Sequence, residues 1–222
     1  MKNNFLQNNT GYTIIETMIA VSLFLIIAVT AMGAFLNANV LHQKSQDVRS
    51  IMDNMTFMME DMSRNLRTGY NYHCFLSGDT MPTTTSNLVS VPKSSTNASN
   101  CWGISFEPET GVPSNDGIDN ASDNDQWVYY IGPDTNLPGN PLAVWKSTVG
   151  PYAAAGFVKL TPDEVVIQSV SSFAVLGAES YSSGNRQQPF VTIRLVGKIL
   201  LKNGETPFNL QTSVSQRLID VN

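Results

Sequence analysis

Charged side chains are scarce in this sequence, and cations are the scarcer sign. Only 14% of the 222 residues are Asp, Glu, Lys or Arg, against about 25% in an ordinary soluble domain. The chain has 13 Lys and Arg residues against 18 Asp and Glu residues, a formal net charge of −5. Nucleic-acid-binding proteins of the usual kind need a net cationic face, so nucleic acid is not expected as a partner.

Cysteine and proline are restricted as well. Two cysteines exclude a disulfide-dense mini-protein. All 11 prolines lie between Pro82 and Pro207, which excludes a second long helix in that stretch. A mean hydropathy close to zero leaves room for one apolar span at most. The apolar content of 42% is too high for a wholly disordered chain.

Motifs of the common catalytic sites are also missing. The sequence has no phosphate-cradling glycine loop, no H-E-x-x-H, no G-x-S-x-G and no zinc-type Cys/His spacing. Neighbouring carboxylates such as Asp163 and Glu164 diverge if they lie on a strand. We therefore expect a protein that is not an enzyme and holds no organic cofactor.

One apolar run is present, and it is long. No charged residue occurs from Thr17 to Gln43, and Met18 to Leu36 is almost purely apolar. As a helix, that second stretch spans about 28 Å, close to the roughly 30 Å core of a bilayer. It lacks the polar stripe of a core helix, so it belongs to the membrane class of segments.

A secretory signal peptide is one alternative for this run, and a permanent N-terminal anchor is another. The residues before the run carry only Lys2 and Glu16, whose charges cancel. The run is long for a signal peptide, and Ala34 and Ala38 offer no convincing cleavage site behind it. The signal peptide is therefore disfavoured, which leaves a permanent anchor or a more specialised segment.

Glu16 is the unusual residue at the mouth of the run. A carboxylate at the bilayer centre costs roughly 2.5–3.5 kcal/mol, and less near the interface. One interpretation is an interfacial residue that marks the start of the span. The other is a carboxylate whose desolvation is offset by a partner.

The residues from Gly11 to Glu16 read GYTIIE. This string, directly before a long apolar helix and after a short polar leader, resembles the processing motif of type IV prepilins and type II secretion pseudopilins. The resemblance implies that prepilin peptidase cuts after Gly11 and that Tyr12 becomes the N-methylated N-terminus, where the family more often has Phe. It also implies that Glu16 pairs with the N-terminal amine of a neighbouring subunit, which supplies the partner its desolvation requires.

The resemblance implies a function and a location. We expect a minor pilin or pseudopilin, a structural subunit of a type IV pilus or type II secretion-like filament that acts in assembly initiation or in the tip complex. Its partners are other pilins through their N-terminal helices, the inner-membrane assembly machinery, and membrane lipid before assembly. The chain is expected to cross the bacterial cytoplasmic membrane once with its head exported, and then to enter a cell-surface or periplasmic filament.

Two other functions stay open. One is a tip adhesin or DNA-uptake subunit of the same machinery, although loss of Lys2 with the leader makes the mature chain more acidic. The other is a membrane-anchored protein with an unrecognised activity.

The amphipathic pattern that follows the apolar run predicts that the helix continues. Apolar residues recur at three- and four-residue steps from Val48 to Leu66, with charged residues between them. We expect the five methionines of this face to pack against a sheet rather than to bind a ligand. Gly69 is a plausible terminator of the helix.

The rest of the chain is expected to form a β-rich head. Apolar runs between turn residues predict strands, and Asn203-Gly204 reads as the turn between the last two. The strand runs are 102–106, 127–131, 142–145, 157–160, 165–176, 190–201 and 210–219. The length and the late strand pair resemble the larger minor pilins, of the W type in pili or the J type in type II secretion.

The predicted fold class is therefore α+β and type IV pilin-like, with a long N-terminal α-helix packed on an antiparallel β-sheet. Residues 1–11 form the leader and 12–39 the transmembrane and filament-core helix. Residues 40–68 form the amphipathic helix that continues into the head. The globular head is 69–222, with a loop insertion at about 74–126.

Cys74 and Cys101 are the only cysteines, and they bracket a low-complexity stretch. Export of the head implies an oxidising compartment, in which these two residues allow one disulfide. Two buried thiols are the alternative.

Residues 115–125 read NDGIDNASDND and concentrate carboxylate and amide oxygens, the ligands that Ca²⁺ takes. The candidate ligands are Asp116, Asp119, Asp123 and Asp125. Their spacing does not match an EF-hand, and a solvated acidic turn is favoured, although some pseudopilins bind calcium.

Overall fold

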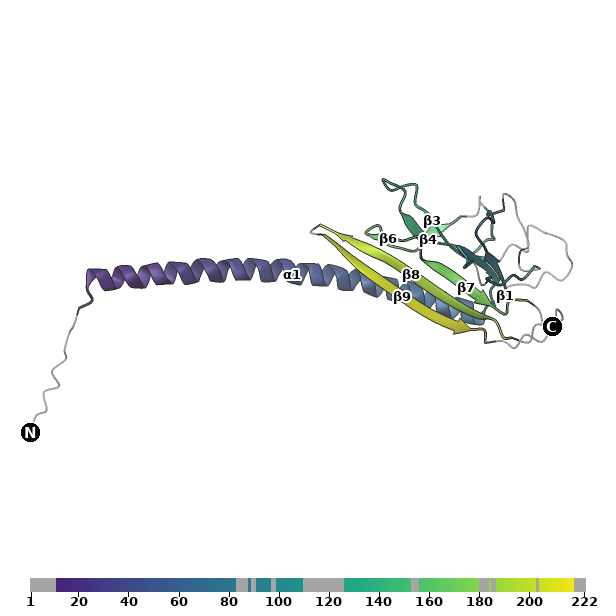
Figure 1. Cartoon of the computed structure of the whole chain (residues 1–222), viewed down its shortest axis with the longest axis horizontal. Coiled ribbons are helices and arrows are strands. Elements are labelled where there is room, and N and C mark those ends of the chain that lie inside the picture. Colours follow the sequence, from purple (N-terminus) through teal and green to yellow (C-terminus); the bar gives the residue numbers. More distant parts are fainter. Residues whose placement is uncertain are drawn as a thin grey trace, which may run out of the picture. The chain divides into compact units, whose positions relative to one another are not determined.

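The computed structural model is an α+β protein, with one long helix followed by an antiparallel sheet (Figure 1). It describes residues 11–82, 88, 91–96, 99–109, 126–152, 156–179, 184, 187–202 and 204–217. The chain divides into two compact units, Met1–Gln46 and Asp47–Asn222.

The single described helix, α1, runs over Ile14–Thr68. Its first turn is capped by Thr13, whose backbone oxygen accepts hydrogen bonds from the amides of Glu16 and Thr17. It ends directly before Gly69, where a Cβ atom would come within 2.4 Å of the Phe106 ring. The close approach of that ring therefore requires glycine at the end of the helix.

In the first unit, the helix is apolar from Met18 to Leu36, and the side chains of this stretch are exposed. Among the described residues it is the one helix that is long and apolar enough to cross a membrane. Water does not solvate such a surface favourably, and the helix is compatible with a membrane span.

In the second unit, α1 packs one face against the core. The helix side of this core consists of four methionines and a leucine, Met55, Met58, Met59, Met62 and Leu66, all at most 7% exposed. They belong to the same cluster as the buried strand residues, and Met52 packs against its margin. The methionines of the amphipathic face are therefore packing residues, as the three- and four-residue spacing predicted.

In the described part of the chain, nine strands form the sheet. They are β1 (Tyr70–Phe75), β2 (Gly103–Glu107), β3 (Trp127–Pro133), β4 (Leu142–Ser147), β5 (Val158–Lys159), β6 (Val165–Ile167), β7 (Ser172–Leu176), β8 (Phe190–Leu201) and β9 (Gly204–Ser215). The strand order is β1-β2-β3-β4-β6-β8-β7, with β5 beside β4 and β9 beside β8. Every pair of strands is antiparallel.

The sheet curls, so that its two ends β1 and β7 are linked through the segment around Lys93 and Cys101. The amide of Lys93 donates to the Tyr72 carbonyl at 3.0 Å, and that of Ser95 donates to the Val175 carbonyl at 2.8 Å. Cys101 exchanges two backbone hydrogen bonds with Phe173 on β7. Part of the backbone hydrogen-bonding groups on the outer edges of β1 and β7 are thus paired.

The strands β8 and β9 form the longest hairpin, with twelve residues in each strand and a continuous register from Phe190↔Ser215 to Leu201↔Gly204. Of the two predicted turn residues, Gly204 is instead the first residue of β9 and pairs with Leu201, and Asn203 lies outside the described residues. The run 165–176, predicted as one strand, is divided into β6 and β7, because the chain turns at residues 168–171, where the Ser171 amide donates to the Gln168 carbonyl.

Candidate functional site

The N-terminal segment from Gly11 to Glu16 leads into the apolar part of α1. Gly11, Tyr12 and Thr13 precede the helix, and Glu16 lies in its first turn. The Thr13 hydroxyl accepts a weak hydrogen bond of 3.4 Å from the Glu16 amide. The T-x-x-E spacing is that of a capping box, a signal that the sequence itself carries.

This geometry gives Glu16 a local role beside the one expected from the family resemblance. A carboxylate in the first turn interacts favourably with the positive end of the helix dipole. Glu16 is exposed, as are its apolar neighbours: Tyr12 and Ile14 are each 82% exposed. The structure places the three residues Gly11, Tyr12 and Glu16 on one short exposed segment. Their roles in cleavage, methylation and subunit pairing stay predictions.

In the head, Cys74 and Cys101 form a disulfide with an S–S distance of 2.01 Å. Both sulfurs belong to fully buried residues. Cys74 lies on β1, and Cys101 bonds through its backbone to β7. The disulfide therefore reinforces the place where the two ends of the curled sheet meet.

His73 lies beside this disulfide and is 9% exposed. Its Nδ1 lies 2.6 Å from the Val91 carbonyl, and its ring meets the edge of Phe75. Burial lowers the pKa of His73 below its usual value, and nearby Lys93 acts in the same direction. His73 is thus a neutral side chain that holds the 91–95 segment against β1.

The proposed calcium ligands Asp116, Asp119, Asp123 and Asp125 lie outside the described residues. Within the part of the chain that the structure describes, no group of three or more His, Cys, Asp or Glu side chains is arranged to hold a metal ion.

Buried or half-buried carboxylates in the described part of the head have local partners. Asp134 accepts from Lys159 at 2.8 Å, and Lys159 also contacts Asp163. The hydrogen bond from Lys159 holds the pKa of Asp134 below its usual value. Asp79 pairs with Lys93 at 2.6 Å, which likewise lowers the pKa of Asp79. The Lys159 pairs join loop residues to β5, and the Asp79–Lys93 pair joins two residues that lie between β1 and β2.

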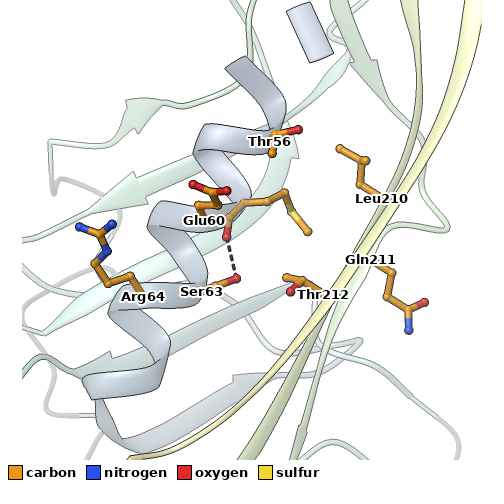
Figure 2. A pocket seen from close by; sticks show the side chains of 8 residues that line it. Thr56, Glu60, Ser63, Arg64, Leu210, Gln211 and Thr212 are labelled. Carbon is orange, nitrogen blue, oxygen red and sulfur yellow. Dashed lines mark hydrogen bonds between the residues drawn. The ribbon is translucent and has the colours of Figure 1, made fainter. Parts of the chain in front are cut away.

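A groove of about 460 Å³ lies in the second unit between α1 and β9 (Figure 2). Its volume falls within the range of small ligand pockets. The helix wall consists of Thr56, Met59, Glu60, Ser63 and Arg64, and the strand wall of Leu210, Gln211 and Thr212. Leu210 and Thr212 point toward the helix, whereas Gln211 points away from it (Figure 2).

Sequence reasoning did not find this groove. The helix and strand walls are about 150 residues apart in the chain, and their polar side chains look like ordinary surface positions. Only the pairing of β8 with β9 and the packing of Met59 bring the walls together. A single sequence carries no signal that these two distant segments lie side by side.

Comparison with known proteins adds no relative: no family model, curated protein or solved structure matches this chain.

Proposed function

We propose that this chain is a minor pilin or pseudopilin, a structural subunit that joins a type IV pilus or type II secretion-like filament. The observation that carries the proposal is the GYTIIE string from Gly11 to Glu16 immediately before the exposed apolar part of α1. A simple membrane anchor needs the apolar helix but has no need of this string.

The exposed helix supports the proposal on energetic grounds. Its large apolar side chains between Ile14 and Leu41 are 46–82% exposed. Covering apolar surface contributes about 25 cal/mol per Å². Lipid supplies that cover while the precursor lies in the cytoplasmic membrane, and neighbouring helices supply it in a filament. The same surface therefore serves both stages.

Glu16 gives assembly its register in this proposal. Once the leader is removed, each subunit carries an ammonium group at Tyr12 and a carboxylate at Glu16. A carboxylate of one subunit that meets the ammonium of the next is neutralised in an apolar bundle, whereas a misplaced subunit leaves a buried charge unpaired.

Variants at the two ends of the motif test the proposal in cells that have an active prepilin peptidase. Gly11→Val should leave the precursor uncut, because it places a branched side chain at the scissile bond, whereas the neighbouring control Thr10→Val should be processed. Glu16→Gln should be cut and remain in the membrane but fail to enter filaments. Normal processing of Gly11→Val together with normal incorporation of Glu16→Gln would overturn the proposal.

A further inference from the structure

Among the residues that the structure describes, no strand pairs with the outer edge of β9. In the described part of the chain β9 pairs only with β8, over twelve residues. Residues Lys93, Ser95 and Cys101 cover part of the edges of β1 and β7, but no described strand covers the outer edge of β9. The unpaired N–H and C=O groups of an exposed edge strand can form hydrogen bonds with a strand of another chain.

The hydrogen-bonding groups of this edge can be assigned by alternation along the strand. The Gln216 amide bonds inward to Pro189, and the Arg217 amide bonds outward to the Arg67 carbonyl at the end of α1. Because a strand alternates at each residue, the amides of Asn209, Gln211 and Ser213 also point outward. Pro207 also occupies an outward-facing position, so its missing N–H group removes no hydrogen bond to β8.

These outward groups border the groove described above. The register between β8 and β9 has no bulge, so the alternation holds along the strand. Met59 and Leu210 form the apolar floor of the groove. The Ser63 hydroxyl donates a hydrogen bond of 2.7 Å to the Met59 carbonyl within the helix. An extended backbone that pairs with the edge would thus lay alternate side chains toward that floor.

We propose that this groove binds an extended segment of a different polypeptide as an additional strand beside β9. The inference needs only the head and stands apart from the proposed filament function.

The charges of the helix wall define the chemistry of the segment. Glu60 and Arg64 are exposed at the groove, and neither forms an ion pair with any side chain that the structure describes. A complementary segment carries a basic side chain for Glu60 and an acidic one for Arg64. The β9 edge of a second copy does not fit, because it has no charged residue between Asn209 and Ser215.

Selection from a random nonapeptide display library tests the proposal, using the full chain in detergent. The expected peptides alternate small apolar and polar residues and carry one acidic and one basic side chain. A synthetic copy of the best peptide should protect the amides of Asn209, Gln211 and Ser213 from hydrogen exchange. The copy should lose its binding when its alternate amides are N-methylated.

Two matched variants separate the edge from the side chain. Gln211→Pro removes an outward amide and should weaken peptide binding by about tenfold or more, whereas Gln211→Ala should bind as the native chain does. The double substitution Glu60→Arg and Arg64→Glu should weaken binding of the selected peptide. A peptide with its acidic and basic residues exchanged should restore binding to this variant. The hydrogen-exchange result on the native chain decides the question even where Gln211→Pro fails to fold.

Three results would overturn the proposal. The library would yield no enriched peptide, or the enriched peptides would leave the three outward amides unprotected. Alternatively, the chain alone would associate with itself through an edge that Gln211→Pro disrupts, and the occupant would then be a second copy.

Discussion

At the residue scale, a few polar contacts fix where α1 lies on the sheet of the head. The Asn65 amide group donates to the Tyr129 hydroxyl at 2.9 Å, and the Tyr72 hydroxyl donates to the Gly69 carbonyl at 2.8 Å. Asp61 pairs with Lys146 at 3.2 Å, and the Lys146 ammonium lies 4.3 Å from the centre of the Trp127 ring. Methionines are adaptable in packing, so directional contacts such as these define a single docked position.

The hydrogen bond between Asn65 and Tyr129 gives the first prediction. Tyr129→Phe removes a buried hydroxyl that the Asn65 amide group donates to, so the free energy of unfolding of the head should fall by about 1 kcal/mol. Thermal denaturation of the full chain in detergent measures the change. Tyr130→Phe is the matched control, because the Tyr130 hydroxyl has no hydrogen bond to the described residues. Equal effects of the two substitutions would show that the Asn65 contact contributes nothing.

His73 gives a prediction about pH. Because burial lowers the pKa of His73 in the folded state, the unfolded chain binds more protons below its ordinary pKa of about 6.5. Stability should therefore be full above pH 6.5 and decline as the pH falls below it. The carboxylates with lowered pKa values, such as Asp79, lose their contribution only at more acidic pH.

The pH dependence can be assigned by substitution. His73→Gln should flatten the decline in melting temperature between about pH 6.5 and 5. The same change at His42, which is exposed on α1, should leave the decline as it is. A decline that persists in His73→Gln would place its origin elsewhere.

At the element scale, the sequence predicts an element best where its pattern matches its environment. The bounds of β8 agree with the predicted run 190–201, because Val191, Ile193 and Leu195 alternate with exposed or half-exposed residues. Tyr70–Phe75 is not among the predicted strands, because this stretch follows Gly69 where polar loop composition begins. The run predicted for the last strand begins at residue 210, whereas β9 begins at Gly204. The strand tolerates Pro207 because that position faces the outer edge, where no hydrogen bond to β8 is lost.

The part of β8 that lies between β6 and β9 gives an element-scale prediction. A Cβ atom at Gly197 would come within 2.4 Å of the Val166 carbonyl and 2.8 Å of the Phe208 ring. Gly197→Ala should destabilise the head by about 1–3 kcal/mol, since the backbone has to move. Gly156→Ala, where the added methyl meets nothing within 4 Å, is the control for the thermal melt. Similar melting temperatures for the two variants would contradict the close packing.

The disulfide between Cys74 on β1 and Cys101 gives a second prediction at this scale. Cys74 and Cys101 are separated by 27 positions, a loop whose closure stabilises the folded state by roughly 3.5 kcal/mol in the chain-entropy model. A reductant should lower the melting temperature of the native chain and have no effect on the variant with alanine at both positions. An unchanged melting temperature of the native chain in reductant would show that the closure of the sheet does not depend on the bond.

At the scale of the whole molecule, the two units make opposite demands on their surroundings. In the described part of the first unit, the apolar side chains from Ile14 to Leu41 are exposed, whereas the second unit buries a hydrophobic core of its own. Composition and periodicity predicted an apolar stretch followed by an amphipathic face, because charge vanishes from Thr17 to Gln43 and returns after it. The predicted bounds of 12–39 and 40–68 differ from the division between Gln46 and Asp47. The groove beside β9 and the closure of the sheet were beyond prediction, since both depend on contacts between distant segments.

The central claim is that the string from Gly11 to Glu16 is a processing signal and not merely the start of an anchor. The intact mass of the protein recovered from its native membrane tests that claim most directly. The account predicts a chain that begins at Tyr12 and carries one added methyl group. A chain that still begins at Met1, in cells whose prepilin peptidase is active, would contradict it and leave the protein a single-span anchor whose function lies in its head.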